Sequence, residues 1–134
     1  MEIHVDAGGN INNKLGLQRA PGDLVNTLSW WYERDVLYAK GPNDSLIASM
    51  PYDSTRPWLR ISASTTTVYW ETSADGCTWI SQASAPISAL FPVNSVYVVL
   101  DAQTYSPTPG TGFARYSHLN TGRTDLPLCP TICP

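Results

Sequence analysis

The chain carries little charge and has no cluster of basic residues. Only 14% of its 134 residues are Asp, Glu, Lys or Arg, and the formal net charge is −3. Nucleic acids and anionic membrane surfaces attract proteins through clustered Lys and Arg side chains. We therefore expect neither nucleic acid nor an anionic membrane to be a partner.

Long apolar segments are also missing. No run approaches the roughly 20 residues of a transmembrane helix, so no membrane insertion is expected. The N-terminal residues MEIHVDAGGN lack the basic and apolar regions of a signal peptide. The charge-poor composition, rich in Ser and Thr, nevertheless suits a secreted protein or one on a virion or cell surface. Either the chain is cytoplasmic as written, or it is a fragment or a mature form from which a leader was cut. We expect the second of these, at one of the locations just named.

Residue sets that could carry catalysis are sparse. The acidic residues Glu33 and Asp35 are two positions apart, the spacing that glycosidases use on a strand, but Arg34 between them indicates a solvated turn. His4 and His118 are isolated, and no nucleophile motif surrounds a serine. The expected protein is not an enzyme and needs no cofactor.

Cysteine is scarce and odd in number. Of the three cysteines, Cys77, Cys129 and Cys133, at least one has no partner within the chain. The segment CPTICP lacks the second ligand pair of a zinc site, so no metal is expected. Two states of the tail remain open: a local disulfide between Cys129 and Cys133, or unpaired thiols.

Helical periodicity is lacking, whereas aromatic and β-branched residues are abundant, with five Trp and seven Tyr. Short alternating segments bounded by Gly, Pro, Asn and Asp predict an all-β chain. Strands are expected at residues 2–6, 14–19, 28–33, 36–39, 45–50, 58–63, 67–73, 95–102 and 113–119, and irregular structure at 7–13 and 81–92. The nearly continuous apolar character of residues 95–102 predicts a central strand with Val98 and Leu100 in the core.

The most informative segment is RPWLRISASTTTVYWETSADGCTW, residues 56–79. Two alternating stretches joined by small polar residues predict a β-hairpin. Because side chains alternate across a strand, one face should hold the core residues Leu59, Ile61, Val68 and Trp70.

The other face of this hairpin collects Trp58, Arg60, Tyr69 and Glu71. Aromatic rings can pack on the C–H faces of a sugar, while Arg and Glu hydrogen-bond its hydroxyls, so this face is the first candidate binding surface. Further rings come from Trp30, Trp31 and Tyr38, where the neighbouring tryptophans must point to opposite sides of a strand. The alternative is that these are ordinary surface aromatics, which strands favour in any case.

The runs W-L-R-I and V-Y-W-E-T-S-x-D-G-x-x-W resemble the hairpin of concanavalin A-like jelly-roll domains of secreted bacterial and phage proteins. In those domains S-x-D-G-x-x-W is a recurrent turn, and the resemblance covers about residues 28–120. It implies an antiparallel β-sandwich with the jelly-roll arrangement. Such sandwiches serve as lectins, carbohydrate-binding modules, glycosidases and passive structural modules.

The chain departs from this family at its N-terminus, because only about 25 residues precede the region of resemblance. Either the sandwich is reduced or further strands lie outside the sequence. A reduced sandwich leaves an edge strand bare, which allows a homodimer to form through that edge. We expect one sandwich domain over residues 1–122 and an irregular tail over residues 123–134 that is dispensable for folding.

These observations together favour a non-catalytic, lectin-like module that binds carbohydrate or another cell-surface ligand. The competing prediction is a structural or adhesion module of a phage or cell-surface assembly. A glycoside hydrolase is disfavoured because the acidic motif that this chemistry uses is missing from the hairpin.

Overall fold

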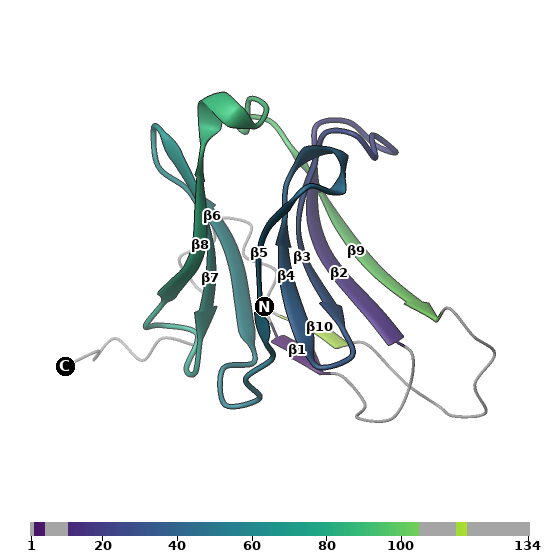
Figure 1. The fold of residues 1–134 in the computed structure, drawn as a ribbon, viewed down its shortest axis with the longest axis vertical. Coiled ribbons are helices and arrows are strands. Elements are labelled where there is room, and N and C mark those ends of the chain that lie inside the picture. Colours follow the sequence, from purple (N-terminus) through teal and green to yellow (C-terminus); the bar gives the residue numbers. More distant parts are fainter. Residues whose placement is uncertain (1, 5–10, 105–114, 118–134) are drawn as a thin grey trace.

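The computed structural model describes residues 2–4, 11–104 and 115–117, and it confirms an all-β chain in which two antiparallel sheets pack together as a sandwich (Figure 1). Sheet A contains, in spatial order, β10 (Arg115–Ser117), β1 (Glu2–His4), β6 (Trp58–Ala63), β7 (Thr67–Ser73) and β8 (Ile80–Pro86). Sheet B contains β5 (Leu46–Pro51), β4 (Val36–Lys40), β3 (Thr27–Glu33), β2 (Ile11–Gln18) and β9 (Tyr97–Thr104). Two 3-10 turns, η1 (Pro42–Asp44) and η2 (Ile87–Ala89), lie in connections. No helix in these residues is long and apolar enough to cross a membrane.

A two-residue turn joins β3 to β4 at the position that the sequence predicts. Arg34 and Asp35 both have positive φ, 49° and 60°, which matches the right-handed twist of the flanking strands. The Tyr32 hydroxyl donates a 2.7 Å hydrogen bond to Oδ1 of Asp35. Burial and this bond to a carboxylate raise the pKa of Tyr32 to about 12. Asp35 therefore supports the turn, while Glu33 ends β3.

Two buried tryptophans join the sheets across the core. The indole Nε1 of Trp30 in sheet B donates to the backbone oxygen of Arg60 in sheet A at 3.0 Å. In return, Nε1 of Trp70 in sheet A donates to the backbone oxygen of Ser29 in sheet B at 2.9 Å. Both rings are fully buried. Each indole thus fills the core and satisfies a carbonyl of the opposite sheet.

The aliphatic core surrounds these rings, and the predicted inner face of the hairpin is largely confirmed. Leu59 and Val68 are buried with Trp70, and Ile61 is partly buried against them. Within the described part of the chain, the other buried apolar residues are Leu15, Leu28, Tyr32, Leu37, Ala39 and Phe91.

The prediction of a central strand at residues 95–102 is wrong. Strand β9 lies at the end of sheet B and pairs with β2. Val98 and Leu100, expected in the core, are 47% and 41% exposed. A continuous apolar run resembles a strand buried on both faces, but sequence alone does not show where a strand lies within its sheet.

Parts of two segments expected to be irregular are strands. Residues 81–92 include most of β8, whose small residues Ala83 and Ala85 pair with Trp70 and Val68. Residues 7–13 include the start of β2, where Asn12 and Asn13 pair with Glu33 and Tyr32 despite the usual preference of Asn for turns. In both cases pairing with a strong neighbouring strand overrides weak local propensity.

Cys77 is disulfide-bonded. The other two cysteines of the chain are Cys129 and Cys133, which lie outside the described residues together with the expected tail 123–134 and its local bridge.

Candidate functional site

The outer face of the β6–β7 hairpin brings together the residues that the sequence analysis placed there. Arg60 lies directly opposite Glu71, Ser62 opposite Tyr69, and Trp58 opposite Ser73. Because the opposite faces of these strands hold the buried core, this set points away from sheet B. We call the surface formed by Trp58, Arg60, Ser62, Tyr69, Glu71 and Trp79 the hairpin face.

Glu71 is the centre of the hairpin face. Its Oε2 accepts hydrogen bonds from Nε of Arg60 at 2.7 Å and from Oγ of Ser62 at 2.6 Å. The Glu71 side chain is only 13% exposed. Burial raises the pKa of Glu71, but the two hydrogen bonds and the positive charge of Arg60 outweigh it, so the net shift is downward. The carboxylate is thus held ionised and fixed in position.

Trp79 covers the Arg60 guanidinium, whose carbon lies 4.1 Å from the ring centroid. Arg60 is therefore fixed between a carboxylate and an aromatic ring, an arrangement that suits its planar side chain. The ion pair uses Nε, and the Arg60 side chain is 38% exposed. A ligand would meet a fixed hydrogen-bond donor beside a ring.

The turn that carries Trp79 is tightly bonded. Oδ1 of Asp75 accepts hydrogen bonds from the backbone N–H of Thr78 at 2.7 Å and of Cys77 at 2.8 Å, and from Oγ of Ser73. These bonds, the one from Thr78 first, hold the pKa of Asp75 well below its usual range. The S-x-D-G-x-x-W spacing thereby sets the position at which Trp79 resumes the extended chain.

Gly76 in this turn has a positive φ of 75° and lies directly against Trp58. A Cβ at position 76 would come within 3.3 Å of the indole Cδ2. The backbone conformation therefore favours glycine, and a Cβ would in addition crowd the ring. Trp58 is half-buried as a result.

Trp79 and Ser62 were not predicted as site residues. Trp79 was recognisable only as the last residue of the turn motif, and its contact with Arg60 depends on the bonded geometry of Asp75. Ser62 could have been found from alternation, since it shares the outer side of β6 with Arg60.

The secondary candidates are divided between the core and the other sheet. Trp30 is fully buried, so of the tryptophan pair only Trp31 can contact a ligand. Trp31 and Tyr38 pair on the outer side of sheet B. The amine of Lys40 lies 4.0 Å from the Trp31 ring centroid, and that of Lys14 lies 5.7 Å away. This second aromatic patch is therefore separate from the hairpin face and is covered by lysines.

No group of three or more His, Cys, Asp or Glu side chains in the described residues could hold a metal ion. Comparisons of the chain with protein-family models, curated proteins and solved structures find no significant match.

Acidification is expected to destabilise the fold partly through Glu71. The folded-state pKa of this residue is lowered from 4.5, so its contribution is present above that value and is lost as the pH falls through the folded-state pKa. Urea unfolding at pH values from about 7 to 3 should show a shallower acid loss for Glu71→Gln than for the wild type. Parallel pH profiles for the two proteins would contradict this.

Proposed function

We propose that the chain is a non-catalytic, lectin-like module that binds neutral carbohydrate through the hairpin face. The observation that carries this is the fixed unit of Glu71, Arg60 and Trp79. A sugar hydroxyl can accept a hydrogen bond from the exposed edge of Arg60 while an apolar C–H face packs on an indole. Because Glu71 neutralises Arg60, a neutral glycan fits this unit better than a strongly acidic one.

A concanavalin A-like jelly-roll arrangement is part of the proposal. It is supported by the turn motif and by pairing of early strands with late ones, β1 with β10 and β2 with β9. A secreted, virion-surface or cell-surface location is supported by the disulfide at Cys77, because such bonds persist in oxidising compartments.

A glycan array tests the proposed function. The wild type should bind one or more neutral glycans, and Trp58→Ala and Tyr69→Ala should each weaken that binding. Tyr97→Ala is the matched control, because Tyr97 is an exposed aromatic residue on the other sheet. If Trp58→Ala and Tyr69→Ala bind normally while Trp31→Ala and Tyr38→Ala do not, the site is on sheet B instead.

A structural or adhesion module is the second candidate, favoured by the exposed apolar edge at β9. This strand ends sheet B, and Tyr97, Val98 and Leu100 are all more than 40% exposed. A long apolar edge strand can pair with the same strand of a second copy. A stable dimer in size-exclusion chromatography, together with no binding to any arrayed glycan, would replace the lectin proposal by this one.

A further inference from the structure

A small pocket opens between the sheets, on the opposite side of sheet A from the hairpin face. Strands β5 and β8 are the last strands of their sheets and face each other there. The pocket has a volume of about 140 Å³. This resembles the engineered cavity of roughly 150 Å³ that accepts one benzene ring, and it is below the several hundred Å³ of drug-sized sites. A group the size of one ring fills the pocket, and a larger ligand would enter it only in part.

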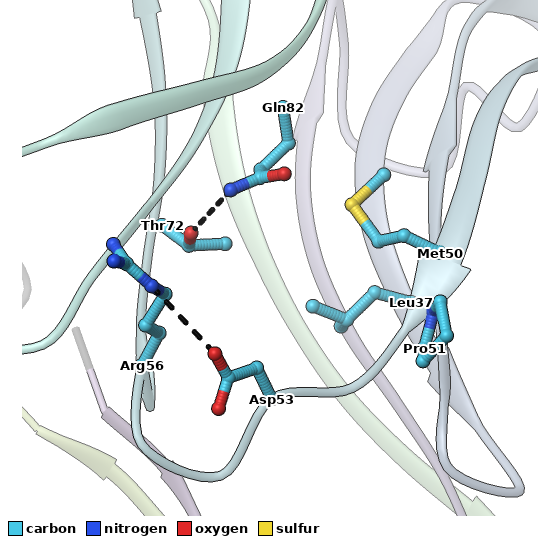
Figure 2. A pocket seen from close by; sticks show the side chains of 7 residues that line it. All are labelled: Leu37, Met50, Pro51, Asp53, Arg56, Thr72 and Gln82. Atoms are coloured by element: carbon cyan, nitrogen blue, oxygen red, sulfur yellow. Dashed lines mark hydrogen bonds and ion pairs between the residues drawn. The ribbon is translucent and has the colours of Figure 1, made fainter.

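The pocket has an apolar wall and a polar wall, which Figure 2 shows on opposite sides. The apolar wall is formed by the side chains of Leu37, Met50 and Pro51 from sheet B. The polar wall belongs to sheet A and to the β5–β6 connection. Its members are Asp53, Arg56, Thr72 and Gln82.

A β-bulge directs Gln82 into the polar wall. Ser81 pairs with Glu71 and Ala83 with Trp70, so Gln82 is an extra residue between them. Its side-chain Nε2 donates a 2.9 Å hydrogen bond to Oγ1 of Thr72, a residue on the core side of β7. Bulges commonly re-aim one side chain beside a functional site. Here the bulge gives the pocket an amide group at its mouth.

The charges of the pocket balance. Nε of Arg56 lies 3.6 Å from Oδ2 of Asp53, an exposed ion pair that closes the lower end in Figure 2. Hydrogen bonds from Thr55, through its side chain first, hold the pKa of Asp53 below its ordinary value. A ligand therefore meets both donors and acceptors with no net charge. A charged ligand would be attracted by one member of this pair and repelled by the other, so it gains little over a neutral one.

We propose that this pocket binds a single neutral hexose unit. One edge of a hexose can enter the pocket and place C–H groups against the wall of Leu37 and Met50. Its hydroxyls can donate hydrogen bonds to Asp53 and Gln82 and accept them from Arg56 and Gln82. The pocket is independent of the hairpin face, because its residues lie on other strands or on the opposite side of β7. A glycan could therefore be held at either site alone.

Methionine methyl labelling tests this directly, because the chain has only two methionines and Met50 lines the pocket. Glucose, galactose and mannose are titrated separately up to about 50 mM, since one sugar ring is expected to bind with a Kd of roughly 1 mM or weaker. At least one should shift the Met50 methyl signal with saturation. Gln82→Ala and Arg56→Gln should each raise that Kd at least about fivefold, the loss of one hydrogen bond.

Ser49→Ala is the matched control, because Ser49 precedes Met50 on β5 but pairs with Tyr38 on the outer side of the sheet. It should bind like the wild type. The proposal is wrong if no hexose shifts Met50, if both pocket variants bind normally, or if cyclohexanol shifts Met50 as strongly as the hexoses do. If no hexose binds at Met50 but the protein binds glycans on the array, this proposal is wrong and the proposed function of the hairpin face stands. If a hexose binds at Met50 but the hairpin-face variants bind arrayed glycans normally, the pocket proposal stands and the hairpin-face proposal is wrong.

Discussion

Replacing Trp70 by phenylalanine is expected to lower the free energy of unfolding by about 2–4 kcal/mol. The change removes the bond from Nε1 to the Ser29 carbonyl and opens a cavity between the sheets. For a domain of this size we expect the melting temperature to fall by roughly 3–5 °C per kcal/mol. Chemical and thermal unfolding of the purified variant measure both quantities.

Trp79→Phe is the matched control for this substitution. It is the same chemical change at a partly exposed ring, which packs on the Arg60 side chain. We expect it to alter the free energy of unfolding by less than about 1 kcal/mol. Equal destabilisation by the two variants would contradict the role of Trp70 in joining the sheets.

Replacing Trp79 by alanine is expected to weaken glycan binding at least about tenfold. The ring holds the Arg60 guanidinium flat and contributes its own contact surface, and cation–π contacts of this kind are worth about 0.5–2 kcal/mol before any ligand contact is counted. Fluorescence titration or calorimetry with the best glycan from the array would give the ratio of Kd values.

Arg60→Lys separates the positive charge of Arg60 from the stacking of its planar guanidinium on Trp79. Lysine keeps the positive charge beside Glu71 but lacks the planar fork that stacks on the ring, so we expect binding to weaken here too. Normal binding by both Trp79→Ala and Arg60→Lys, in proteins with unchanged circular dichroism, would show that the cluster does not contact the ligand.

Much of the hairpin could be predicted because alternation fixes which side chains share a face. Once Leu59 and Trp70 are assigned to the core, Arg60 and Glu71 must lie together on the other side, as the register confirms. The position of Trp79 could not be deduced in this way. It depends on three hydrogen bonds to one Asp75 oxygen, and side-chain bonds of that kind leave no periodic signal.

The errors at β8 and β9 have a common physical cause. Sequence pattern reports the local character of a strand, but its burial depends on which strands lie beside and above it. Strand β8 is rich in Ser and Ala, yet it pairs along β7, and the apolar strand β9, like β8, is the last strand of its sheet. The pocket was likewise not predictable, because it combines residues from β4, β5, β7 and β8 with a bulge at Gln82.

The most direct test of the central claim follows the indole N–H signals of the five tryptophans by NMR during titration with a glycan that binds on the array. The buried Trp30 and Trp70 serve as internal references because their N–H groups are bonded across the core. If the hairpin face is the binding site, the signals of Trp58 and Trp79 shift with saturation while that of Trp31 stays in place. A saturable shift of Trp31 with no change at Trp58 or Trp79 would contradict it.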